Sequence, residues 1–180
     1  MIKKLLFIFI LFNTLFTHGL LVADEIRDPY KYFFDETWGN FQEELEKAKK
    51  ENKKAILVFF EMDECPFCHY MKKNVLNRSS VQKYFHENFL IFNIDIEGDI
   101  EIVNMKGKTV KQKDFAFKEN RVRATPVIAF FDLNGKRIFR HTGKTAGADE
   151  FMLIGKYVAE EIYKDMSFTR YKRKVKKTKK

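Results

Sequence analysis

The only two cysteines of the chain stand close together in the motif Cys65-Pro66-Phe67-Cys68. A cysteine thiolate can attack a disulfide, and a second cysteine nearby can then attack the mixed disulfide that forms. The thiolate is favoured at the N-terminus of a helix, where free N–H groups and the helix dipole stabilise negative charge. Two cysteines this close also enclose too short a loop to stabilise a fold. The motif therefore indicates redox chemistry or metal binding rather than a structural disulfide framework.

The residues around the motif predict a strand before it and a helix after it. Residues 55–60 form an apolar run rich in β-branched and aromatic residues, which is typical of a buried strand. Pro66 suits the first position of a helix, because its missing N–H is not needed there. We therefore predict a helix over residues 66–76 that begins just after Cys65, with Cys68 about one turn further along.

The remaining pattern predicts a single α/β domain. Further helices are predicted over residues 35–50, 81–88, 111–120 and 148–166, from capping residues and from apolar residues at helical spacing. Further strands are predicted over residues 89–96, 127–132 and 137–141, and Asn134-Gly135 predicts a hairpin turn between the last two. Helices separate the first two strands, which favours parallel pairing. The expected fold is a central mixed sheet flanked by helices.

The N-terminal residues predict export. Lys3 and Lys4 precede an unbroken apolar run over residues 5–12, and small residues follow at Gly19 and Ala23. This order is typical of a signal peptide, which we assign to residues 1–23. It implies a periplasmic protein, in a compartment where disulfides persist. The alternative is an uncleaved membrane anchor that leaves the domain facing the periplasm.

The C-terminal residues are strongly basic. The last fifteen residues contain eight lysines and arginines and no acidic residue, whereas the chain without its two ends is close to neutral. The surface of the domain, assigned to residues 24–166, thus gives no indication of nucleic-acid binding. We interpret residues 167–180 as a disordered tail, which could contact an anionic membrane surface weakly.

A second motif, Thr125-Pro126, stands immediately before the predicted strand at residues 127–132. With the C-x-x-C motif after the first strand, with Phe130-Phe131-Asp132 and with the Asn134-Gly135 turn, it gives the chain a specific resemblance. The chain resembles the thioredoxin-like superfamily, and within it the periplasmic thioredoxin-related proteins of the SoxW type. The resemblance covers roughly residues 35–164 and implies a thioredoxin-like fold.

The resemblance also implies an activity and the residues that support it. It implies a thiol–disulfide oxidoreductase, without a cofactor, in which Cys65 attacks and Cys68 resolves. Pro126 corresponds to the cis-proline that faces the C-x-x-C motif, and Thr125 offers main-chain groups to a bound peptide. Pro66 and Phe67 complete the expected contact surface. The implied partners are cysteine-containing periplasmic proteins and a membrane or soluble electron donor, and the implied direction is reduction.

The chain departs from the typical thioredoxin pattern near the motif. Typical thioredoxins have a buried aspartate six residues before the first cysteine, where this chain has Phe59, and a tryptophan directly before it, where this chain has Glu64. Glu61 is the nearest candidate for the aspartate's role in proton transfer, and it could equally be an ion-paired residue at the strand end. The negative charges of Asp63 and Glu64 oppose the effect of the helix terminus on the Cys65 thiolate.

Two rival interpretations remain for the cysteines. His69 follows Cys68 directly, and C-x-x-C-H is the attachment sequence of a c-type haem, with the histidine as axial ligand. The surrounding α/β pattern speaks against this alternative, a haem electron carrier. A closed zinc site needs four ligands, and His86 and His141 lie far along the chain without paired spacing. We therefore predict no metal site.

Overall fold

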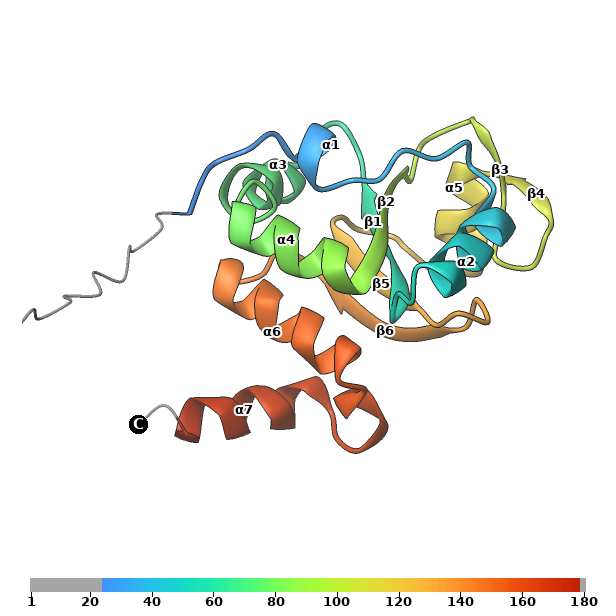
Figure 1. The fold of residues 1–180 in the computed structure, drawn as a ribbon. Coiled ribbons are helices and arrows are strands. Elements are labelled where there is room, and N and C mark those ends of the chain that lie inside the picture. Colours follow the sequence, from blue (N-terminus) through green and yellow to red (C-terminus); the bar gives the residue numbers. More distant parts are fainter. Residues whose placement is uncertain (1–23, 179–180) are drawn as a thin grey trace, which may run out of the picture.

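The computed structural model describes residues 24–178, and its centre is one mixed four-stranded sheet (Figure 1). The strand order is β2-β1-β5-β6. Strand β1 pairs with β2 in parallel and with β5 antiparallel, and β5 pairs antiparallel with β6. The predicted α/β class and central mixed sheet are thus confirmed. The strands are β1 (Ala55–Glu61), β2 (Phe89–Asp95), β5 (Val127–Phe131) and β6 (Arg137–Thr142).

Helices cover both faces of the sheet. One face is covered by α3 (Pro66–Asn74), α4 (Ser79–Asn88) and α6 (Ala148–Ala159), and the other by α2 (Phe41–Lys50) and the π-helical turn η1 (Phe115–Glu119) (Figure 1). Because neighbouring residues of a strand point to opposite faces, Leu57 and Phe59 of β1 enter the first core and Val58 and Phe60 the second. Strand β1 is therefore apolar from Ala55 to Phe60.

The smaller elements lie at the edges of these layers. They are α1 (Pro29–Tyr32), the hairpin strands β3 (Glu101–Val103) and β4 (Thr109–Lys111), α5 (Gln112–Asp114) and the 3-10 turn η2 (Ile162–Lys164). Strands β3 and β4 pair antiparallel as a small hairpin. The helix predicted over residues 111–120 is instead the short α5 followed by the π-helical turn.

Two predicted helices have different bounds in the structure. The helix expected over residues 35–50 begins at Phe41, because Gly39 has a φ of +79° and Asn40 caps the helix with its side chain. The helix expected over residues 148–166 ends at Ala159. There Glu161 adopts a left-handed conformation, with a φ of +55°, and stops the helix.

The expectation of a disordered C-terminal tail is wrong. Residues Phe168–Thr178 form helix α7, which packs against α6 (Figure 1). The ring of Phe168 lies 5.6 Å from that of Phe139 and 5.4 Å from that of Tyr157, measured between centroids. Lys172 also forms an ion pair with Glu150 at the start of α6. Aromatic packing therefore orders a segment whose charge suggested disorder.

The assigned signal peptide lies outside the described residues, so export stays a prediction. Within residues 24–178, no helix is both long enough and apolar enough to cross a membrane.

Candidate active site

The two cysteines lie at the start of α3, a few residues after the end of β1. Cys65 is the N-cap residue of α3 and Pro66 its first helical residue, as predicted. The sulfur atoms of Cys65 and Cys68 are joined in a disulfide, and the main-chain N–H of Cys68 donates a hydrogen bond to Cys65 Sγ at 3.0 Å. Cys65 is 4% exposed and Cys68 is fully buried. This geometry favours negative charge on Cys65, the outer sulfur, in the reduced form.

The Thr125-Pro126 motif lies at the same end of the sheet. Val127 pairs with Phe60, so the two residues before β5 lie beside the end of β1, from which the chain continues to Cys65. The Thr125–Pro126 peptide bond is cis. Pro126 is buried and Thr125 is half-buried. The fold thus brings together two motifs that are separated by about 60 residues in the sequence.

The surface beside the disulfide is aromatic. Phe67, the second residue between the cysteines, is 53% exposed. Pro66, on the same turn of α3, is exposed as well. The segment that follows β6 lies close by, because the N–H of Gly143 donates to the carbonyl of Pro126 at 2.8 Å. The four residues predicted to contact substrate thus lie on two segments at the same end of the sheet, Pro66 and Phe67 in the first turn of α3 and Thr125 and Pro126 just before β5.

Glu61 lies at the end of β1, buried and ion-paired. Its carboxylate accepts hydrogen bonds from Lys72 Nζ at 2.7 Å and from the side-chain amide of Asn93 at 3.0 Å. Lys72 also donates to the hydroxyl of Tyr30. The structure therefore shows Glu61 as an ion-paired residue at the strand end. A role of Glu61 in proton transfer stays a prediction. Phe59, at the position of the typical aspartate, is fully buried in the apolar core.

The histidine of the C-x-x-C-H sequence points back to the turn before the motif. Its Nε2 lies 2.9 Å from the carbonyl oxygen of Asp63, so Nε2–H donates to that oxygen. The nitrogen is thus already engaged within the chain, and both sulfurs are used in the disulfide. Over residues 24–178, no cluster of three or more histidine, cysteine or acidic side chains could hold a metal ion.

A comparison with models of known protein families agrees with the fold and the site described above. The model of the thioredoxin-like domain family matches residues 41–159, about two thirds of the chain. The chain belongs to the thioredoxin-like domain family. The match begins at helix α2 and ends with α6, so it includes both motifs of this thioredoxin-like site. A comparison with curated proteins finds no match.

Solved structures share the same fold. A thioredoxin-fold protein from Helicobacter pylori is 24% identical with a TM-score of 0.57, and the alignment covers 69% of this chain and 81% of that one. A putative disulphide-isomerase from Bacteroides thetaiotaomicron is 25% identical with a TM-score of 0.54, over 77% of this chain and 96% of that one. A thioredoxin from Thermus thermophilus is 18% identical with a TM-score of 0.53, over 71% and 87%.

Two lysines of this thioredoxin-like site, Lys72 and Lys144, were not predicted from the sequence. Lys72 lies on α3 four residues after Cys68, and residues at that spacing share a helix face, so its position beside the strand end could have been inferred. Lys144 gave no sequence signal. It reaches the site only because the chain after β6 returns to Pro126.

Proposed function

We propose that this thioredoxin-like protein is a periplasmic thiol–disulfide oxidoreductase that reduces disulfides of exported proteins. The observation that carries the proposal is the Cys65–Cys68 pair at the N-terminus of α3, next to the cis peptide bond of Thr125–Pro126. The location rests on the predicted signal peptide and on the SoxW-type resemblance. The direction of the reaction rests on that resemblance alone.

The reduction proceeds in two exchange steps. The thiolate of Cys65 attacks one sulfur of the substrate disulfide, which forms a mixed disulfide and releases the other substrate sulfur as a thiolate. The thiolate of Cys68 then attacks Cys65 Sγ, which releases the second substrate thiol and leaves the Cys65–Cys68 disulfide. Two electrons have passed to the substrate. A dithiol electron donor, membrane-bound or soluble, restores the reduced pair by the reverse sequence.

The surrounding residues have defined tasks in this proposal. The main chain of Thr125 holds the substrate peptide, while Pro66, Phe67 and Pro126 shape the surface on which it lies. Glu61 is the candidate for accepting the proton of the Cys68 thiol, with Lys72 holding its carboxylate in place.

Single cysteine variants test the activity. Cys68→Ser should accumulate mixed disulfides with partner proteins, because Cys65 attacks and nothing resolves the product. Cys65→Ser should accumulate none, since the attacking sulfur is missing. Non-reducing gels of the exported fraction, followed by identification of the trapped proteins, measure both. Wild-type disulfide turnover in both variants would refute the proposal, and an intense Soret band in the purified protein would favour the haem carrier instead.

The direction is tested by the equilibrium reduction potential of the Cys65–Cys68 pair. A reductant should have a potential near that of thioredoxin, roughly −270 mV, whereas an oxidant should lie near DsbA, roughly −120 mV. The helix terminus stabilises the Cys65 thiolate and raises the potential, and Asp63 and Glu64 oppose it. We expect a value on the thioredoxin side, measured by equilibration with glutathione or dithiothreitol buffers. A value near DsbA would exclude the reductive direction.

A further inference from the structure

An exposed lysine, Lys144, lies over two aromatic rings of α3, the helix that begins at the redox pair. The Nζ atom of Lys144 lies 4.2 Å from the ring centroid of Tyr70 and 5.7 Å from that of Phe67. Phe67 stands between the two cysteines in the sequence and is half exposed, so the ammonium group lies over one side chain of the motif itself. The attraction between a cation and aromatic faces holds it in this position.

The segment that carries Lys144 is fixed on both sides. On one side, the N–H of Gly143 donates to the carbonyl of Pro126 at 2.8 Å. On the other, the N–H and hydroxyl of the fully buried Thr145 lie 3.4 and 3.5 Å from Sδ of Met71 in α3. Lys144 therefore bridges the two halves of the site, and its place does not depend on a free loop.

The charge of Lys144 has no partner within residues 24–178, where no carboxylate lies within ion-pair distance of it. The acidic residues nearest in sequence to the motif, Asp63 and Glu64, stand on the turn before Cys65, whereas Lys144 contacts the helix after it. An aromatic contact leaves the N–H donors of an ammonium group available to a carboxylate. Arg123, close before Thr125, likewise lies over an exposed ring, that of Phe117, at 5.5 Å.

We propose that Lys144 is a specificity-determining residue, which selects disulfides flanked by acidic residues. The inference rests on the proposed function. A disulfide attacked at Cys65 must approach the surface formed by Phe67 and Pro126, and the ammonium group stands at its edge. An aspartate or glutamate beside the substrate cysteine meets that charge, whereas a lysine or arginine there is repelled. The preferred substrates are therefore exported proteins with a carboxylate next to the reactive cysteine.

Two matched peptides test the inference. The reduced full-length protein is mixed with fluorogenic peptide disulfides that are identical except for glutamate or lysine beside each cysteine. At low ionic strength the wild type should reduce the glutamate peptide about fivefold faster, as expected for a contact between exposed charges. Lys144→Glu should invert the preference. Lys144→Met, which keeps the apolar stem, should abolish it, and salt at about 0.5 M should weaken it in the wild type.

A control variant makes the same charge change elsewhere. Lys136 lies in the turn between β5 and β6, at the opposite end of the hairpin from Pro126 and Gly143, and Lys136→Glu should keep the wild-type preference. Equal rates for both peptides with the wild type, or an unchanged preference in the two Lys144 variants, would overturn the inference while leaving the proposed function intact. If the wild type reduces neither peptide, the proposed function fails and the inference falls with it.

Discussion

The carboxylate of Glu61 is buried at the end of β1, where its oxygen lies 2.7 Å from Lys72 Nζ. Burial by itself lowers the pKa of Lys72, but the hydrogen bonds that its ammonium group donates to Glu61 and Tyr30 outweigh this and raise the pKa above its usual value. Lys72 thus stays protonated throughout the physiological range. The pair joins the strand before the cysteines to the helix after them, so it fixes the turn that carries Cys65.

Removing the lysine should destabilise the protein in a pH-dependent way. Lys72→Met leaves a buried carboxylate with only the Asn93 amide, and it should cost about 3 kcal/mol of unfolding free energy at pH 7. Because the folded-state pKa is raised, this contribution is present below pH 10.5 and is lost as the pH rises through the folded-state value. Denaturant unfolding at pH 7 and above pH 10.5 measures it. Lys73→Met, at an exposed neighbouring position, is the control, and an equal loss in both variants would contradict the argument.

The site residues that could be predicted are those whose residue type and position beside a predicted strand or helix indicate their role. The cysteine pair, Pro66 and the Thr125-Pro126 motif were found because each stands at a strand or helix boundary. The two lysines reach the site through tertiary contacts, to Glu61 in one case and to Phe67 and Tyr70 in the other. The four-residue spacing between Cys68 and Lys72 on α3 could have indicated the position of Lys72, whereas nothing in the local sequence indicates that of Lys144.

Most strands and helices followed from hydrophobic patterning, and the failures have identifiable physical reasons. Helix α4 has no side-chain cap from its own N-cap residue. The N–H of Ser80 in its first turn donates instead to the carboxylate of Asp24, which also accepts from the hydroxyl of Ser79. A cap more than 50 residues away cannot be inferred from local sequence.

Helix α7 was missed because its charge concealed its apolar face. Phe168, Tyr171 and Val175 recur at helical spacing, and the first two pack against the core formed by α6 and β6. Six basic residues within the helix, and eight over residues 166–180, had suggested disorder. Packing of two aromatic side chains, with the Lys172–Glu150 ion pair, is sufficient to order the helix, so composition alone was a poor guide here.

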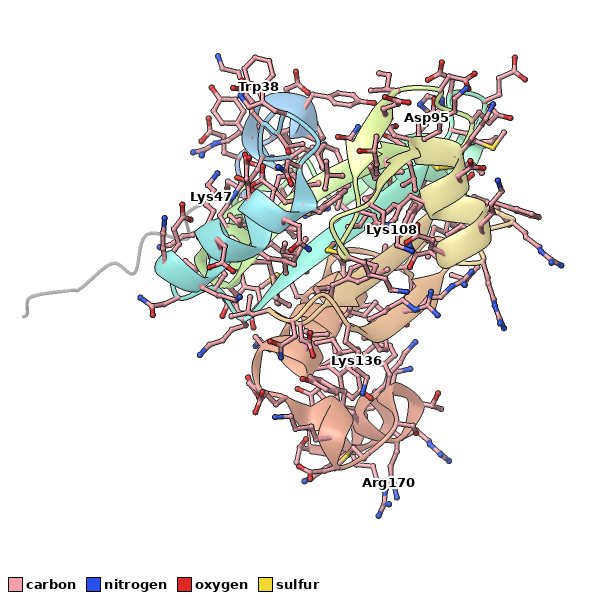
Figure 2. All side chains as sticks on the ribbon, turned by 90° about the vertical axis from the view of Figure 1, so that its right-hand side faces the viewer. Trp38, Lys47, Asp95, Lys108, Lys136 and Arg170 are labelled. Carbon is pink, nitrogen blue, oxygen red and sulfur yellow. A yellow bond between two sulfur atoms is a disulfide. The ribbon has the colours of Figure 1, made fainter. Side chains whose placement is uncertain are left out.

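On the scale of the whole molecule, basic charge is concentrated at one end. Helix α7 lies beyond α6 and apart from α3, the helix that begins just after Cys65, in Figure 1, and Figure 2 places Arg170 at the end opposite Trp38 and Asp95. The helix directs several basic residues to solvent, and no acidic residue interrupts them: Arg170, Arg173, Lys174, Lys176 and Lys177. A folded helix thus presents as one surface the charges that the sequence had suggested were spread along a disordered tail.

This arrangement predicts membrane-surface binding that is independent of catalysis. Replacing Arg170, Arg173, Lys174 and Lys177 by glutamine keeps the aromatic face of α7 but removes charges worth about 1 kcal/mol each near an anionic surface. Binding of the exported protein to phosphatidylserine vesicles should therefore weaken at least about tenfold at low salt, and added salt should have the same effect on the wild type.

Disulfide reduction should be unchanged in this variant, because α7 lies away from the cysteines. The control for vesicle binding replaces four exposed lysines elsewhere by glutamine and so changes the net charge equally: Lys50, Lys106, Lys108 and Lys136. If the control loses binding as much as the α7 variant, net charge alone accounts for the effect. If neither charge removal nor salt affects binding, α7 is not a membrane-facing surface, and slower reduction in a folded α7 variant would show that the helix also serves the active site.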